Sequence, residues 1–203
     1  MRSLYNYIIY SENRYNNSTD IEGKELILNT EISERDFMYT NRIGKVVSVP
    51  MLENSELKKD DLVLLHHNVF RRWIDIYGKE KDSSSFITES QYSVSPDQIY
   101  AYKRNGDWQC LNNYCFVKPI KDDSKWSILK EKELFGELVY SNRYLESLGL
   151  SVGDVVGFSP DSEYEFNIDN QKLYRVLSNQ VTIKYGSKEK SNWSIRNCFD
   201  WTR

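Results

Sequence analysis

A short pattern that occurs twice constrains this chain more than any other feature of its sequence. Residues 42–47 (RIGKVV) and residues 134–139 (LFGELV) each place a glycine inside an alternating apolar run. The aspartate that opens the next apolar run follows this glycine after 17 residues in the first copy, at Asp61, and after 18 in the second, at Asp154. Such self-similarity predicts one structural unit used twice, so we expect a pair of related domains. Gly44, Gly136 and Gly153 are expected to be structural and to supply backbone freedom at strand starts and turns.

The composition of the chain favours β-structure. Ala101 is the only alanine among 203 residues, whereas 15 residues are tyrosine and 14% are aromatic. Alanine is the strongest helix former, and aromatic and β-branched residues are enriched in strands. Asn105-Gly106 and Asp169-Asn170 lie between strand-like segments and predict tight hairpins, because these residues tolerate positive φ. The expected fold class is all-β, with two small antiparallel barrels or sandwiches.

Strand and turn signals divide the chain into two domains and a tail, and they predict loops at 11–20 and 78–85 and a strand at 62–66. The first domain covers residues 1–104, with a long loop at 11–41 and an insertion at 71–90 that a minimal domain would not need. The second domain covers residues 105–186, and a short C-terminal tail follows at 187–203.

The order of these features in each half resembles the GroES-like (chaperonin-10) co-chaperonin family. Residues 150–156 (LSVGDVV) match the family's L-x-x-G-D-x-V turn, and residues 57–63 (LKKDDLV) match it with Asp60 in the place of the usual glycine. The family domain begins with a strand and a basic residue, which residues 116–119 (FVKP) match more closely than residues 7–10 (YIIY). The resemblance extends from the first strand to Tyr185 and implies two tandem GroES-like, partly open β-barrel domains with long loops.

The resemblance also implies a function without catalysis. In this family a mobile loop presents a short aliphatic segment that binds a chaperonin ring and so assists protein folding. Two segments of this chain match that description, 26–28 (LIL) in the first loop and 126–129 (WSIL) in the second. The implied partner-binding residues are Leu26, Ile27, Leu28, Trp126, Ile128 and Leu129. The implied partner is a chaperonin ring, and the chain itself is expected to form a homo-oligomer.

One such loop binds weakly by itself. Each buried Leu or Ile gains about 1.5–3 kcal/mol, and ordering the loop costs roughly 1 kcal/mol or more for each fixed residue. Several loops on one ring bind tightly through their effective concentration. The alternative for both segments is an ordinary strand packed into its own domain, and Trp126 in particular is a natural core residue.

A second hypothesis is a structural or assembly protein, such as a virion component, that uses the same fold. The insertion at 71–90 and the aromatic tail at 193–201 add surface that a ring lid does not require. Tyr and Trp residues with polar neighbours often form protein interfaces. The abundance of Asn, Lys, Ile and Tyr is consistent with an AT-rich genome, such as that of a phage.

Charge and targeting signals argue against several other partners. The net charge is −3 and the isoelectric point is about 5.6, which does not favour binding to nucleic acid or to an anionic membrane. Residues 70–73 (FRRW) combine aromatic and basic groups as single-strand binders do, but a surface ion-pair cluster is the favoured interpretation. The chain shows no signal peptide and no apolar run of the roughly 20 residues that a membrane helix needs. Three cysteines suit a reducing compartment, so we expect a cytoplasmic protein.

The sequence predicts no enzyme, cofactor or metal site. Adjacent residues on a strand point to opposite faces, so His66-His67 is not expected to ligate one metal. Cys110 and Cys115 lack the C-x-x-C spacing of a zinc site and are expected to be buried free thiols. Three carboxylates either line an acid/base cleft or, as we favour, form a solvated strand face: Asp161, Glu163 and Glu165.

Overall fold

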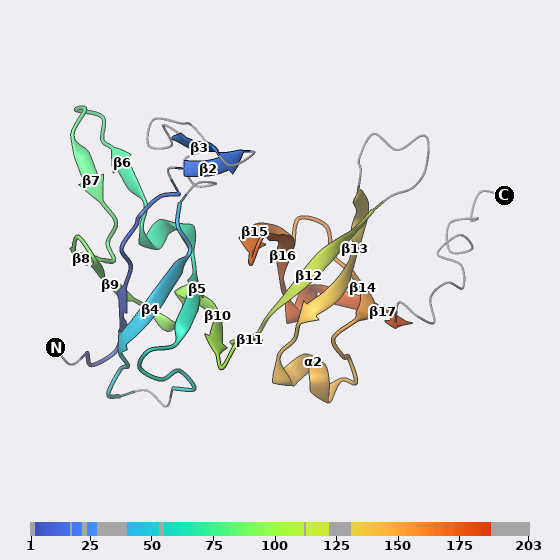
Figure 1. Cartoon of the computed structure of the whole chain (residues 1–203). Coiled ribbons are helices and arrows are strands. Elements are labelled where there is room, and N and C mark those ends of the chain that lie inside the picture. Colours follow the sequence, from blue (N-terminus) through green and yellow to red (C-terminus); the bar gives the residue numbers. More distant parts are fainter. Residues whose placement is uncertain are drawn as a thin grey trace. The chain divides into compact units, whose positions relative to one another are not determined.

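A computed structural model describes residues 3–16, 18–21, 24–27, 40–52, 55–111, 113–121 and 131–187 of the chain. These residues form antiparallel β-sheets, three 3-10 turns and one short helix, α2 (Arg143–Ser147), which confirms the predicted all-β class. The chain forms two compact units, Met1–Trp108 and Gln109–Arg203 (Figure 1). Across the described ranges, no helix has the length and apolar character needed to cross a membrane.

The first unit is built on an open seven-stranded antiparallel sheet with the order β11-β10-β5-β4-β1-β9-β8. Its strands are β1 (Tyr7–Tyr10), β4 (Ile43–Ser48), β5 (Leu62–Leu65), β8 (Phe86–Thr88), β9 (Gln91–Val94), β10 (Ile99–Arg104) and β11 (Asp107–Cys110). Two separate hairpins belong to the same unit (Figure 1). They are β2 (Ser18–Ile21) with β3 (Lys24–Ile27), and β6 (Arg72–Ile74) with β7 (Glu80–Asp82).

The second unit is an open six-stranded antiparallel sheet with the order β15-β16-β12-β13-β14-β17. Its strands are β12 (Tyr114–Lys121), β13 (Glu131–Tyr140), β14 (Asp154–Phe158), β15 (Tyr164–Ile168), β16 (Gln171–Leu177) and β17 (Val181–Ser187). Asp169 and Asn170 both have positive φ between β15 and β16, and Asn105 and Gly106 do so between β10 and β11. Both predicted hairpins are therefore confirmed.

The two sheets share one strand order once β11 is set aside. The first strands, β1 and β12, pair with β4 and β13 on one side and with β9 and β16 on the other. On the side of β4, the first sheet continues with β5 and then β10; on the side of β13, the second sheet continues with β14 and then β17. At the opposite edge lie β8 in the first sheet and β15 in the second. Among the described strands neither sheet closes into a barrel. The predicted insertion at 71–90 holds the β6–β7 hairpin and also β8, which has a counterpart in β15.

The repeated L-x-x-(D/G)-D turn has the same backbone geometry in both units. Asp60 and Gly153 both have positive φ, at 74° and 90°. Their N–H groups donate to the carbonyls of Val46 and Leu138, each at 2.8 Å. Asp60 adopts the left-handed conformation that glycine adopts in the second copy, and Asp is among the residues that tolerate it.

The aspartate of each turn is nearly buried and closes the turn with its side chain. Asp61 and Asp154 each accept a hydrogen bond from the backbone N–H three residues earlier, at 2.7 and 2.8 Å. Each also pairs with a cation, Asp61 with Arg104 at 2.6 Å and Asp154 with Lys184 at 2.8 Å. Burial opposes ionisation of both carboxyls, but the hydrogen bonds and the cations outweigh it and lower their pKa values.

The repeated glycine of β4 and β13 is required by close packing. A Cβ atom at Gly44 would lie 2.3 Å from Cγ2 of Ile9, and one at Gly136 would lie 2.9 Å from Cβ of Val117. Ile9 and Val117 are fully buried and occupy matching places in β1 and β12. The expectation of backbone freedom is wrong for these two glycines, because the constraint is the space left by the neighbouring strand.

Each unit has its own apolar core. In the first unit Phe70 and Tyr92 pack edge to face with ring centroids 4.6 Å apart, and both are almost fully buried. In the second unit one cluster joins strands β12, β13, β14 and β16 to helix α2. Its buried members are Cys115, Val117, Leu138, Leu145, Leu150, Val156, Phe158 and Val176.

Three segments differ from the sequence prediction. Residues 11–20 and 78–85 are predicted as loops, yet they contain part of β2 and all of β7. Both segments are mostly polar in sequence and pair with a hairpin partner, so no apolar periodicity marks them as strands. The strand predicted at 62–66 ends at Leu65, and His66 instead caps the 3-10 turn η1 (His67–Val69).

Candidate functional site

The connection between β1 and β4 forms an arm whose two ends are held together. We use "the arm" for residues 11–42, of which 11–16, 18–21, 24–27 and 40–42 are described. Tyr15 and Thr40 form an antiparallel bridge, and the Asn41 N–H donates to the carbonyl of Arg14 at 2.8 Å. The Asn41 side chain also donates to Ser11 Oγ at 2.8 Å. The arm therefore starts and ends at one closed base.

The β2–β3 hairpin of the arm carries two of the six predicted partner-binding residues. Leu26 and Ile27 lie in β3, opposite Thr19 and Ser18 of β2. Their exposed fractions are 48% and 80%, so neither is packed into the core of the unit. The other four predicted residues lie outside the described part of the chain: Leu28, Trp126, Ile128 and Leu129.

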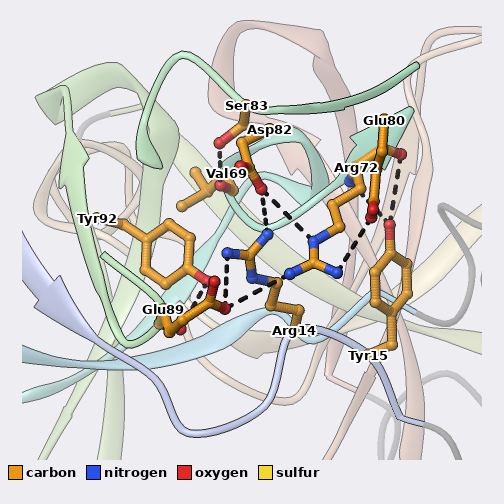
Figure 2. Close-up of polar contacts among 9 residues, drawn as sticks. All are labelled: Arg14, Tyr15, Val69, Arg72, Glu80, Asp82, Ser83, Glu89 and Tyr92. Atoms are coloured by element: carbon orange, nitrogen blue, oxygen red, sulfur yellow. Dashed lines mark hydrogen bonds and ion pairs between the residues drawn. The ribbon is translucent and has the colours of Figure 1, made fainter. Parts of the chain in front are cut away.

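Arg14, at the base of the arm, ties it to the β8–β9 region (Figure 2). Its side chain is only 9% exposed and forms ion pairs with Asp82 and with Glu89, the latter at 3.1 Å. The guanidinium carbon lies 4.6 Å from the ring centroid of Phe86. Burial raises the pKa of neighbouring Tyr92, although Arg14 opposes this effect. A buried cation with two carboxylates and an aromatic face fixes the direction in which the arm leaves the sheet.

Arg72 connects the same base to the β6–β7 hairpin (Figure 2). Its guanidinium pairs with Glu80 at 3.1 Å and with Asp82 and Glu89 at 3.5 Å. Its backbone N–H donates to the Tyr15 hydroxyl at 2.8 Å. The base of the arm and the β6–β7 hairpin are therefore joined in one network, and the β2–β3 and β6–β7 hairpins extend from the same end of the first unit (Figure 1).

The β6–β7 hairpin presents several exposed apolar side chains, of which only Trp73 belongs to a motif noted in the sequence. The exposed fractions are 47% for Trp73, 69% for Ile74, 91% for Ile76 and 86% for Tyr77. The Asp75 carboxylate caps the turn by accepting from the N–H groups of residues 77 and 79, both at 2.9 Å. The sequence feature that could have indicated these side chains is the apolar pair Ile76-Tyr77, which lies directly before a glycine in an otherwise charged segment.

A cleft of about 470 Å³ lies in the second unit, between the start of β13 and the β14–β15 connection. Its lining residues are Glu131, Lys132, Glu133, Leu134, Phe158, Pro160, Asp161, Glu163 and Tyr174. Two of the three carboxylates noted in the sequence, Asp161 and Glu163, line this cleft, whereas Glu165 pairs with Lys172 at 3.4 Å instead.

Of the carboxylates that line this cleft, Glu131 alone has hydrogen-bond and ion-pair partners among the described residues. It accepts from the Tyr174 hydroxyl at 2.7 Å and pairs with Lys172 at 3.1 Å. Burial opposes its ionisation, but these two partners lower its pKa. Glu131 is thus a stabilised carboxylate, which does not suit the role of a general acid.

The histidines and cysteines do not assemble into a reactive site within the described ranges. His66 and His67 stack with ring centroids 4.2 Å apart, so the expectation of opposite faces is wrong, because His66 caps the turn η1 and His67 begins it. Cys110 and Cys115 are buried free thiols, and burial raises both pKa values, that of Cys115 to about 12. Among the described residues no group of three or more His, Cys, Asp or Glu side chains is placed to hold a metal ion.

The aromatic and basic segment at 70–73 is divided between three environments. Phe70 is buried, Arg72 belongs to the ion-pair network, and Trp73 is half exposed on the hairpin. These side chains do not form one stacking platform of the kind that binds single-stranded nucleic acid.

No protein-family model matches this sequence, and no curated protein matches it significantly. The fold and the site together define an all-β protein of two topologically similar units. The first unit presents two hairpins with exposed apolar side chains.

Proposed function

We propose that this chain is a co-chaperonin-like protein that binds a chaperonin ring through the arm and thereby assists protein folding. The observation that carries the proposal is the exposure of Leu26 and Ile27 on a hairpin that leaves the unit from a closed base. The hairpin lies between the first two strands of the shared topology, where the resemblance to GroES-like proteins places the mobile loop. The repeated turn and the shared strand order support the same resemblance.

The energetics of such an interaction favour an oligomer. Full burial of two aliphatic side chains gains roughly 3–6 kcal/mol. Ordering the contacting residues of the arm removes a large part of this gain, at roughly 1 kcal/mol or more for each residue. A single arm then binds only weakly, and several arms on one homo-oligomer raise the effective concentration enough for stable capping. We place this activity in the cytoplasm.

The test is binding to a purified chaperonin ring in the presence of ATP, followed by size-exclusion chromatography. We expect the wild-type chain to migrate with the ring and the variant Leu26→Ser/Ile27→Ser to lose this association. Met51→Ser/Leu52→Ser is the matched control, because these two apolar residues of the first unit are also exposed, at 58% and 64%. If the arm variant and the wild type bind the chaperonin ring equally well, the proposal is wrong.

The alternative function is a structural or assembly protein, such as a virion component. The observation that favours it is the β6–β7 hairpin, whose exposed Trp and Tyr side chains are residue types common at the centre of interfaces. The same chromatography separates the two functions. Stable complexes with other proteins of the native source, and none with the chaperonin, would favour the assembly role.

A further inference from the structure

We propose that the tip of the β6–β7 hairpin of one chain binds the acidic cleft of a second copy of the same chain. The tip consists of Trp73, Ile74, Ile76, Tyr77 and Lys79 in the first unit. The cleft is the one of about 470 Å³ in the second unit. This contact is independent of chaperonin binding and can exist whether or not the arm has a partner.

The hairpin tip is organised before it binds. The Asp75 side chain closes the turn with two backbone hydrogen bonds of 2.9 Å, and Gly78 supplies the positive φ of 75°. At the other end of the hairpin, the ion pairs of Arg72 fix the strands to the body of the unit. A rigid hairpin loses little conformational entropy on binding, and a Trp and a Tyr provide large apolar area.

The cleft offers both an apolar floor and an acidic rim. Leu134, Phe158 and Pro160 contribute apolar surface, and a volume of about 470 Å³ falls within the usual range of pockets that accept large side chains. Two of the lining residues, Leu134 and Asp161, have positive φ values of 62° and 58°. Such left-handed conformations are unfavourable for L-residues and occur often at binding sites.

The charges of the two surfaces are complementary. Near the tip, Lys81 pairs with Asp75 at 3.9 Å and Glu80 pairs with Arg72 at 3.1 Å, so the remaining charge is the +1 of Lys79. In the cleft, Glu131 already pairs with Lys172, so Glu133, Asp161 and Glu163 carry three negative charges against one positive charge on Lys132, a net of −2. A basic, apolar projection and an acidic, apolar cleft on the same chain favour a second copy as the occupant.

The contact joins different surfaces on the two partners, so it is heterologous. Each chain has one tip and one cleft, and a bound copy still offers its own free tip or cleft. Association of this kind continues until a ring closes or an open chain forms. The contact therefore provides a route to the homo-oligomer that the proposed function uses, by residues outside the arm.

The experiment is sedimentation equilibrium of the full chain over a wide concentration range. We expect the wild type to self-associate and Ile76→Ser/Tyr77→Ser to weaken association by about thirtyfold, as for the loss of a central interface residue. The matched control Leu52→Ser, which changes an exposed apolar residue elsewhere on the first unit, should associate like the wild type. All of the changed residues are exposed, and unchanged circular dichroism verifies that the variants fold.

Charge exchange distinguishes this contact from any other. Lys79→Glu and Glu163→Lys should each weaken self-association when studied alone. An equal mixture of the two variants should recover it, because each changed surface then meets its complement and each wild-type surface meets the other. A wild-type chain that sediments as a monomer at every concentration would overturn the proposal. So would a mixture that associates no better than its components.

Discussion

The buried carboxylate of the repeated turn allows a quantitative test of the fold. In Asp61→Asn, the side chain keeps its size but loses its charge. Asp61 is only 5% exposed and accepts hydrogen bonds from Arg104 at 2.9 and 2.6 Å, in addition to the backbone bond at 2.7 Å. The substitution therefore removes a charged acceptor from a site with little access to water.

The magnitude follows from the two bonds to Arg104. A hydrogen bond to a charged group contributes about 1.5–3 kcal/mol. Arg104 is 30% exposed, and solvent screening reduces the value of the pair. We therefore expect the free energy of unfolding of the first unit to fall by about 2 kcal/mol near pH 7.

The effect must also depend on pH with a definite sign. The pKa of Asp61 in the folded state lies below its ordinary value of 3.8, because Arg104 and the backbone outweigh the effect of burial. The carboxylate then stabilises the fold fully above the unfolded pKa, and this contribution disappears as the pH falls through the folded pKa. The difference between wild type and Asp61→Asn should shrink toward zero in that acidic range.

Urea unfolding monitored by tryptophan fluorescence at a series of pH values measures this difference. Asp60→Asn is the matched control: Asp60 is the neighbouring residue, its side chain is 63% exposed, and Asn also tolerates its positive φ. We expect this control to unfold like the wild type. A destabilisation by Asp61→Asn that persists unchanged at low pH, or none at neutral pH, would show that the charge of Asp61 does not stabilise the turn.

Three further predictions test other parts of the structure. Gly136→Ala should destabilise the second unit by about 1–3 kcal/mol in urea unfolding, because the new Cβ would lie 2.9 Å from that of Val117. A variant as stable as the wild type would contradict the packing argument. Cys115 should react with iodoacetamide at pH 8 only after unfolding, because burial raises its pKa to about 12, and site-resolved mass spectrometry would reveal any rapid native reaction. Arg14→Gln should accelerate amide hydrogen exchange in β2 and β3 by roughly tenfold, because it removes two ion pairs at the base of the arm. Unchanged exchange would mean that the stability of the arm does not depend on Arg14.

Several elements of the fold could be predicted because their signals are local. The hairpin turns at Asn105-Gly106 and Asp169-Asn170 depend on the tolerance of single residues for positive φ, which the residue types already indicate. The hairpin strand β7 could not be predicted in this way. It is polar and exposed, and it exists through pairing with β6 rather than through burial.

The candidate site was only partly predictable for the same reason. Leu26 and Ile27 stand out in the sequence as an aliphatic segment in a polar connection, and the structure places both on an exposed hairpin. The ion pair of Arg14 with Asp82 spans 68 positions, and no local pattern connects them. The exposed cluster at the tip of β6–β7 likewise becomes visible only when the rest of the chain is seen to leave it uncovered.

The sequence by itself determined the all-β class, the repetition and the turns, because strand propensity and positive φ depend on residues close together in the chain. Only the tertiary structure decided why Gly44 and Gly136 are glycines, since the atoms that exclude a side chain there belong to Ile9 and Val117 on a neighbouring strand. Burial and charge pairing likewise depend on contacts between distant segments. The folded chain alone therefore shows which apolar and charged groups remain available to a partner.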